Sequence, residues 1–442
     1  MKLRKVAAIL MTVITVTVAL AGCSSSEQPK SSQTETTDKT EKITEKAIEK
    51  TTEKITEKNI EKKDITLNFA IPLAEEEWHV FRDQIFKPFE EQTGIKINGI
   101  QMENKDMESK LEALKQAGKH EIDIFAPSTV YLPGIVDKEL AEDLSGGITI
   151  PEQIPTNLYS DFQFDGKTQF VPLRPNVQTN YYYTDYFKQY DLEAPKNWDE
   201  LLHVAKTLYE AEGVGRVAIQ ANSGSALTIT TIEFIRSAGG DPLVLNDEGS
   251  VAAFTYLQEL WPYLSPDSKR ADFNVINELL STEAIYYGAN WPYCATVVVK
   301  ENGKDQVASY VGFEGPEGIS KVTTTTVIGI VKETPHKEEA IQFLEYLMSD
   351  EVQNILFTSL GWAPARNDAI GEIEEWQKPF IDDVQEALKY ANARPIVPYW
   401  SDVDKAINDA FKEIVIDGNK DIQGILDSYH EQIEAAKAIK GE

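Results

Sequence analysis

The sequence predicts an α/β protein of two lobes, each with a β-sheet and covering helices. Three observations favour this class. The chain has 442 residues, which is longer than a domain with a single hydrophobic core ordinarily is. Strand and helix periodicities alternate along most of the chain. A proline-broken segment, an aromatic strand and a capped helix follow one another within residues 171–208. We interpret this stretch as the point where the chain leaves one lobe and enters the other.

The first residues have the pattern of a secretory signal. Lys2, Arg4 and Lys5 precede an apolar run over 6–20, which is short for a membrane span, and Leu-Ala-Gly then leads into Cys23. This motif resembles the bacterial lipobox, in which the cysteine is acylated after cleavage. The resemblance implies a signal peptide over 1–22 and a lipid on Cys23 that anchors the protein on the outer face of the cell membrane. An ordinary signal peptide with an incidental cysteine is the alternative.

Residues 23–63 have the composition of a disordered tether. Ser, Thr, Glu and Lys dominate, and Glu-Lys pairs recur every four residues from Glu41 to Lys62. The stretch holds nine acids and nine bases, so it is neutral. Because the whole chain carries −29 and the signal +3, residues 64–442 carry −32. Such a domain repels phosphate backbones, which argues against nucleic acid and favours neutral or cationic ligands.

The first lobe is predicted from a β-α-β-α-β series. Residues 65–71 alternate as a strand, and a helix follows with Trp78, Phe81, Ile85 and Phe89 on one face. Pro88 is expected to bend this helix and Gly94 to end it. Further strands are expected at 95–97 and 121–125, around a helix that includes residues 107–114. The series predicts a parallel sheet, whose ligands lie beyond the carboxyl ends of the strands, near loops 74–78 and 126–131.

The helix expected after Asn197, within the crossing stretch 171–208, has a recognisable N-terminus. Asn197 suits the N-cap, and Glu200, three residues later, can bond back to free amides. Apolar residues 201, 204, 205 and 208 form one face, and Trp198 is assigned to packing. Beyond it we expect strands at 217–220, 310–313 and 323–331 and helices at 337–348, 350–360 and 403–415.

Four stretches, in chain order, resemble family 1 extracellular solute-binding proteins, the receptors of ABC sugar importers. They are the crossing at 171–208, a strand-Gly-x-x-Trp element at 283–291, a Gly-x-x-Pro-x-Arg loop at 361–366, and an Arg-Pro-x-x-Pro-x-Tyr pattern at 394–400. Two departures exist: Trp400 replaces the tyrosine, and Ile122 replaces the proline of a Pro-Asp-Val strand. The resemblance covers residues 65–435.

The resemblance implies a periplasmic-binding-protein-like fold, in which a multi-strand hinge joins two α/β lobes around a ligand cleft. Lobe 1 would comprise 64–173 plus 320–350, and lobe 2 would comprise 174–319 plus 351–442. The ligand would be a neutral di- or oligosaccharide, delivered to the permease of an ABC transporter. A monomer without cofactor is expected, and the lobes would close on the sugar by hinge bending.

The same resemblance, with the reading of the loops, gives the expected ligand contacts. Tryptophans would stack on sugar rings, with Tyr182 or Tyr183 adding another ring, and polar side chains would bond hydroxyls. The expected binding residues are Glu76, Trp78, Asp123, Ser128, Arg174, Asn176, Tyr183, Asn290, Trp291, Trp362, Arg366 and Trp400.

Other classes of function stay open. A receptor of the same fold could take a cationic solute such as a polyamine, which the acidity allows. A surface carbohydrate-active hydrolase and a scaffold or adhesin without a small ligand are the alternatives from other classes. The five histidines are scattered, without His-x-x-x-His or Cys-x-x-Cys spacing, and no Gly-x-Ser-x-Gly or Walker A loop is present, so no metal site or enzyme is suggested. Cys294 is expected to be a buried apolar filler.

Overall fold

The computed structural model describes residues 65–440 except 74, 165 and 370–372; the side chains of Glu76 and Asp161 are also outside the description. Its first sheet has five strands: β1 (Thr66–Ile71), β2 (Lys96–Gln101), β3 (Ile124–Phe125), β6 (Phe170–Arg174) and β12 (Thr326–Ile330). They lie in the order β2-β1-β3-β12-β6. β1 is parallel to β2 and to β3, as predicted, whereas β12 runs antiparallel to β3 and β6.

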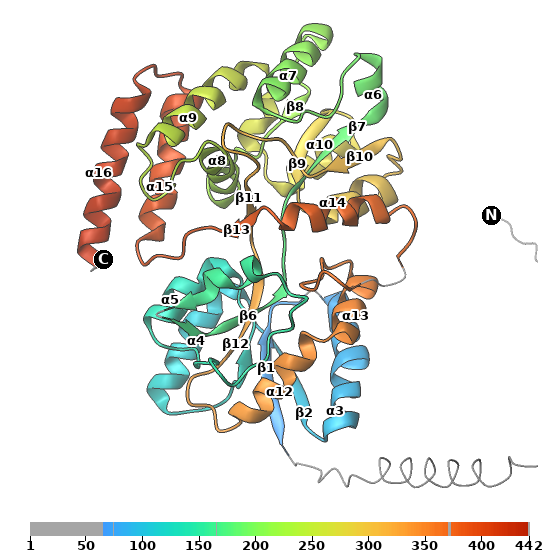
Figure 1. Cartoon of the computed structure of the whole chain (residues 1–442), viewed down its shortest axis with the longest axis vertical. Coiled ribbons are helices and arrows are strands. Elements are labelled where there is room, and N and C mark those ends of the chain that lie inside the picture. The colour runs from blue at the N-terminus through green and yellow to red at the C-terminus, as the bar shows by residue number, and fades with distance from the viewer. Residues whose placement is uncertain (1–64, 74, 165, 370–372, 441–442) are drawn as a thin grey trace, which may run out of the picture. The chain divides into compact units, whose positions relative to one another are not determined.

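Helices cover both faces of this sheet because its strands are apolar on both sides. Leu67, Phe69 and Ile71 of β1 belong to one core cluster and Ala70 to another, which is the period of two expected of a strand. The first cluster includes α12 (Lys337–Leu347) and α13 (Asp350–Leu360), which lie beside α3 (Lys87–Thr93) in Figure 1. The second includes α4 (Asn104–Ala117). The remaining helices around this sheet are α2 (Glu75–Val80), η1 (Phe81–Phe86), η2 (Thr129–Tyr131) and α5 (Leu132–Asp137).

The helix predicted after β1 is present but is not uniform. α2, η1 and α3 run on without a break, and η1, a π-helical stretch, ends two residues before Pro88. Because proline lacks an amide hydrogen, a regular α-helical ladder cannot continue through it. The four apolar residues predicted to share a face are all buried, and Gly94 ends the helix with a φ of 76°, as predicted.

The second sheet has four strands: β7 (Thr179–Tyr183), β8 (Val217–Ala218), β9 (Tyr287–Asn290) and β10 (Val307–Tyr310), in the order β10-β7-β9-β8. A separate large core surrounds it, and Cys294 is buried there, as predicted. The helices of this part are α6 (Thr184–Gln189), α7 (Trp198–Glu212), α8 (Ser225–Ser237), α9 (Glu248–Leu260), η5 (Trp261–Tyr263), η6 (Pro266–Arg270), α10 (Phe273–Ser281), α11 (Tyr293–Ala295), η7 (Thr296–Glu301), α14 (Lys378–Leu388), α15 (Trp400–Phe411), η8 (Lys412–Ile416) and α16 (Ile422–Lys440).

The start of α7 confirms the predicted cap. The side-chain oxygen of Asn197 accepts a hydrogen bond from the Glu200 amide at 2.9 Å. Glu200 reaches back to the amide of Lys196 at 2.8 Å, one residue earlier than expected. Trp198 is buried and stacks on Tyr256, so its assignment to packing is confirmed.

Several segments connect the two sheets. The stretch between β6 and β7 runs antiparallel to the end of β11 (Lys321–Thr323), with Val177 opposite Thr323. The amide of Thr324 and the hydroxyl of Thr323 both donate to the carbonyl of Asn176, each at 3.0 Å. β11 pairs with β13 (Ala391–Ala393), and α14 packs on Val177. Two short strands, β4 (Gln163–Phe164) and β5 (Lys167–Thr168), and two short helices, η3 (Thr156–Leu158) and η4 (Ser160–Phe162), complete the described elements.

The packing of α13 differs from the expected lobe boundary at residue 350. Val352 and Leu356 of α13, and Trp362 after it, lie in the core of the first sheet, because their apolar side chains complete the cluster around Phe81. The rest of the predicted division, 64–173 plus 320–350 and 174–319 plus 351–442, stays a prediction.

The predicted signal peptide over 1–22, the acylated Cys23 and the tether over 23–63 lie outside the described residues. Within the described ranges, no helix combines the length and apolar character that a membrane crossing requires.

Candidate functional site

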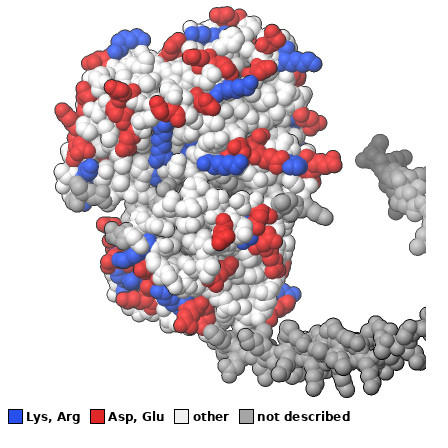
Figure 2. Space-filling view, in the orientation of Figure 1, with Lys and Arg blue, Asp and Glu red and all other residues white. Residues whose placement is uncertain are grey.

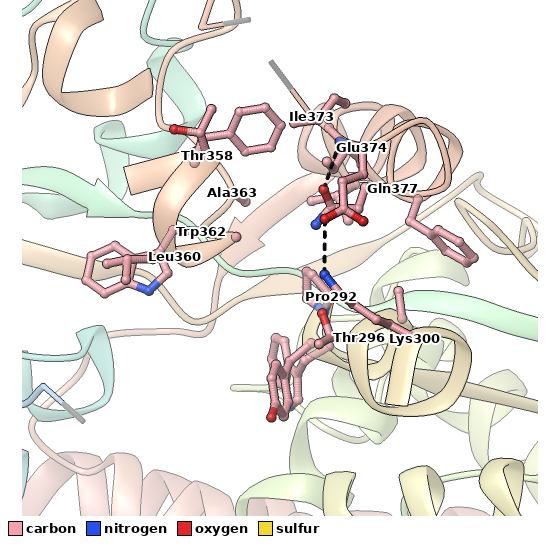
Figure 3. Close-up of a pocket in the computed structure, with 18 of the residues that line it drawn as sticks. Pro292, Thr296, Lys300, Thr358, Leu360, Trp362, Ala363, Ile373, Glu374 and Gln377 are labelled. Atoms are coloured by element: carbon pink, nitrogen blue, oxygen red, sulfur yellow. Dashed lines mark hydrogen bonds and ion pairs between the residues drawn. The ribbon is translucent and has the colours of Figure 1, made fainter. Parts of the chain in front are cut away.

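A cavity of about 440 Å³ lies where segments from both sheets meet. That volume falls in the range of small-molecule sites, about 300–1,000 Å³. Four stretches form its walls: the crossing after β6, the residues from Trp291 to η7, the end of α13 with the loop after it, and the residues from Ile373 into α14. Figure 3 shows these walls, with Trp362 on one side and Lys300 and Glu374 on another.

Trp291 is the partly exposed tryptophan that follows the central strand β9. Asn290 holds it in place, because its side-chain oxygen accepts from the Trp291 amide at 2.9 Å. The amide nitrogen of Asn290 donates to the Phe273 carbonyl and to Asn277, at 2.9 and 2.7 Å. Asn290 is therefore buried and positions Trp291 without facing the cavity itself.

One wall carries a tryptophan, a carboxylate and a guanidinium in mutual contact. The indole nitrogen of Trp362 donates to Glu77 at 2.8 Å. The Arg174 guanidinium lies over the Trp362 ring at 4.5 Å and pairs with Glu77 at 3.8 Å. Burial lowers the pKa of Arg174, yet a free guanidinium titrates so high that the group stays charged.

A second wall repeats this arrangement with different residues. The indole nitrogen of Trp376 donates to Glu374, and the Lys300 ammonium donates to the other Glu374 oxygen at 3.2 Å. Lys300 also lies over the Trp376 ring at 5.6 Å. The bonds from Trp376 and then Lys300 lower the pKa of Glu374, so this carboxyl is ionised at neutral pH.

Four predicted site residues line this cavity: Arg174, Asn176, Trp291 and Trp362. Trp362 was expected to offer a stacking face, but it is only 3% exposed. Arg174 covers part of its ring and Phe81 contacts another part. Arg174 has the most exposed side chain of this group, at 37%, and it lines the cavity.

Residues 84–381 match the family of bacterial extracellular solute-binding proteins, which is more than half of the chain. The chain belongs to this family. Its members are binding proteins rather than enzymes, so the resemblance seen in the sequence and the prediction of a solute receptor are both confirmed.

Known relatives are distant in sequence and close in fold. This solute-binding protein is 22% identical over 351 residues to the putative ABC transporter periplasmic-binding protein YcjN of Escherichia coli strain K12, covering 74% of this chain and 78% of that one. The cyclic α-maltosyl-1,6-maltose binding protein of Arthrobacter globiformis superposes with a TM-score of 0.73 at 19% identity, covering 85% and 99% of the two chains. The maltose-bound MalE of Listeria monocytogenes gives 0.71 at 16% identity, covering 86% and 99%. The predicted periplasmic-binding-protein-like fold is thereby confirmed.

Two other predicted ligand contacts, Trp78 and Asp123, are buried in the part of the protein around the first sheet. Trp78 is buried, and its indole nitrogen donates to Gln101 at 2.8 Å. Asp123 is buried as well and accepts from the Asn68 amide at 2.9 Å and from Thr334 at 2.6 Å. The structure does not bring either side chain to the cavity.

Tyr183, Ser128, Arg366 and Trp400 also lie away from the cavity. Tyr183 is buried and donates to the Leu280 carbonyl at 2.6 Å. Ser128 pairs with Thr326 as a backbone bridge, and its amide donates to Asn104 at 2.8 Å. Arg366 pairs with Asp368 and lines a different hollow on the far side of α14. Trp400 is buried beneath the Arg394 guanidinium, and Glu76 lies in α2 with its side chain outside the description.

Among the cavity residues that were not predicted from the sequence, Lys300, Glu374 and Trp376 carry polar or aromatic groups suited to a ligand. A tryptophan among charged residues just before a Lys-Pro helix start was an available signal for Trp376. No such signal in the sequence marked Lys300, because its contact with Glu374 spans 74 residues. In the described part of the chain, no cluster of three His, Cys, Asp or Glu side chains could hold a metal ion.

Proposed function

We propose that this receptor captures a neutral sugar in the cavity beside Trp291 and delivers it to the membrane permease of an ABC importer. The observation that carries the proposal is the lining itself. A partly exposed indole, Trp291, and two cations line the cavity, and each cation is paired with its own carboxylate. Sugars have apolar C–H faces and many hydroxyls, and this lining offers partners for both. Stacking that removes 50 Å² of apolar surface contributes roughly 1 kcal/mol, so the polar contacts must add the rest.

Relatives of similar fold support a sugar. The Arthrobacter protein is named for cyclic α-maltosyl-1,6-maltose, the Listeria MalE was solved with maltose, and a Thermotoga lettingae solute-binding protein was solved with α-D-tagatose. The Escherichia coli relative supports the partnership with an ABC transporter.

The cavity offers little to a polyamine. Such a ligand needs carboxylates that lack cationic partners, whereas Glu77 pairs with Arg174 and Glu374 pairs with Lys300. The overall charge of −29 acts at long range without creating a cation site in this cavity. On the face drawn in Figure 2, acidic side chains are widely spread and basic ones lie among them.

The proposal includes the setting of the receptor. Cys23 would carry a lipid, residues 23–63 would hold the binding unit above the membrane, and a monomer would meet the permease. Acylation is tested by expressing Cys23→Ser: the variant should leave the membrane fraction, and a variant that stays membrane-bound would contradict it. Light scattering of the purified binding unit checks the monomer.

The ligand class is tested by calorimetric titration with glucose, trehalose, maltose, maltotriose, raffinose, putrescine and spermidine. At least one sugar should bind with a Kd of about 10 µM or tighter, near −7 kcal/mol, and neither amine should do so. Tight binding of an amine without any sugar would overturn the proposal. Cleavage of labelled maltodextrins would favour the hydrolase alternative.

A further inference from the structure

β11, the short strand between the two sheets in Figure 1, carries a buried ion pair. The Lys321 ammonium lies 3.7 Å from the carboxylate of Glu233 on α8, and the two side chains are only 5% and 15% exposed. Glu233 also accepts a hydrogen bond from the Val322 amide at 2.9 Å. The Lys321 ammonium donates to Asn180 of β7 at 3.2 Å. Two elements of the part around the second sheet, α8 and β7, therefore hold β11.

The polar contacts continue across the second sheet. The amide nitrogen of Asn180 donates to the hydroxyl of Tyr287 on β9 at 2.7 Å, and that hydroxyl contacts the hydroxyl of Tyr310 on β10 at 2.8 Å. The backbone leaves room for these groups at Gly312, whose φ is 128°. A Cβ atom there would lie 2.8 Å from the side-chain oxygen of Asn180 and 3.0 Å from the nitrogen of Lys321. A larger residue would therefore push these two side chains apart.

Stability alone does not account for the pair of Lys321 and Glu233. Taking two charges out of water costs free energy that their attraction only partly returns, so two apolar side chains of similar size are often as stabilising. Burial raises the pKa of Glu233 and Lys321 opposes that rise, which shows the same cost at one partner. An ion pair differs from an apolar contact in direction, because it is lost when the strand slides or tilts. The pair therefore specifies the position of β11 on α8.

The chain passes to the first sheet directly after β11. The carbonyl of the buried Thr325 accepts from the amide of Thr129 on η2 at 2.9 Å, and Thr326 begins β12. Thr324 lies between and is half-buried, and its amide donates to the carbonyl of Asn176 on the neighbouring crossing at 3.0 Å. A single residue thus separates the part of this crossing held by α8 and β7 from the part held beside the first sheet.

We infer that the pair of Lys321 and Glu233 fixes β11 to the part of the protein around the second sheet, so that this crossing bends at Thr324 when the two parts move relative to each other. Lys321 is thus a positioning residue, and it does not line the ligand cavity. The predicted lobe boundary at residue 320 moves to 324. A crossing with one joint restricts the directions in which the receptor closes, so less conformational freedom is lost on closure. The joint is the same whichever solute the receptor captures.

The test compares the full chain with its double variant Lys321→Met/Glu233→Gln. The double variant removes both charges and keeps an oxygen that can accept from the Val322 amide. Glu233→Gln alone removes one charge with little loss of packing and takes the place of the double variant if that does not fold. The matched control is Lys337→Met/Glu142→Gln, because Glu142 also accepts from a lysine and from a backbone amide but lies at the far end of β12.

Two readouts separate a local release of β11 from a general loss of stability. Hydrogen exchange followed by mass spectrometry reports how often residues 321–324 open. Distances between spin labels on Lys119→Cys and Lys269→Cys, two exposed positions, report how widely the two parts vary in relative position. A Cys23→Ser background leaves the buried Cys294 as the remaining native cysteine. Thermal melting verifies that each variant is folded.

We expect residues 321–324 to exchange about tenfold faster or more in the double variant, while residues 327–330 of β12 keep the wild-type rate. The label distances should spread over a wider range, and the control should change neither readout. Exchange that quickens equally in every segment would show a loss of global stability only. That result, or unchanged exchange or label distances in a folded variant, would overturn the inference and leave the proposed capture of a sugar untouched.

Discussion

Asp383 lies on a helix that lines the cavity, and its raised pKa makes the stability of the fold depend on pH. It lies on α14, whose Phe380, Ile381 and Val384 face the cavity. Its carboxyl accepts a hydrogen bond from Ser309 on β10, and the phenols of Tyr181 and Tyr182 on β7 lie near enough that Asp383 raises their pKa. Burial first, and then the neighbouring Asp382, raise the pKa of Asp383 to about 6 from an ordinary 3.8.

The direction of the pH dependence of stability follows from the pKa values of Asp383 in the unfolded and the folded chain. Below 3.8 the carboxyl is protonated whether the protein is folded or not, and the fold is fully stable with respect to this group. As the pH rises toward 6 the unfolded chain releases the proton before the folded one does, so stability falls. A pKa difference of about two units corresponds to about 3 kcal/mol of unfolding free energy. Solvent screening of a partly exposed carboxyl reduces this to about 1–2 kcal/mol.

Replacing Asp383 with Asn removes this pH dependence while keeping an oxygen that can accept from Ser309. We predict that Asp383→Asn gains about 1–2 kcal/mol of unfolding free energy relative to wild type between pH 4 and pH 7. The assay is guanidinium unfolding followed by tryptophan fluorescence at pH 4, 5, 6 and 7. The control Asp409→Asn alters an exposed ion pair with Lys405 and should stay within about 0.5 kcal/mol of wild type. A difference between Asp383→Asn and wild type that does not change with pH would refute the reasoning.

Three further predictions concern the cavity and the fold. Trp291→Ala should weaken sugar affinity about tenfold or more in calorimetry, roughly 1.4 kcal/mol, and unchanged affinity would remove the stacking role. Gly99→Ala should destabilise the first sheet by about 1–3 kcal/mol in denaturant unfolding, because the added methyl would lie 2.4 Å from the Trp78 ring; a neutral result would show that the ring moves freely. Asn197→Ala should cost about 1 kcal/mol by loss of the α7 cap, and Asn197→Asp should retain most of the stability; equal losses would argue against capping.

The predictions that held depend on local pattern. The cap at Asn197 and Glu200 joins residues three apart, and the start and end of α13 at Asp350 and Leu360 follow from local helix signals. Trp291, expected from the strand-Gly-x-x-Trp element, lines the cavity, and its contact with a ligand stays a prediction. Such features need no knowledge of the distant chain.

The predictions that differed from the structure depend on distant partners. Trp78 was expected at the ligand, but its indole nitrogen donates to Gln101, 23 residues away, and the ring is buried in the core. Trp362 meets Glu77 across 285 residues, and this contact places it within the first core with little ring left to stack. The Lys300 and Glu374 pair was missed for the same reason. Indole exposure is decided by tertiary packing, which composition and spacing do not contain.

The most direct test is a crystal structure of the protein with the saccharide that binds tightest in calorimetry. The account predicts sugar density in the cavity, with a sugar ring against Trp291 near Arg174. A sugar bound elsewhere on the protein, with this cavity holding only water, would contradict it.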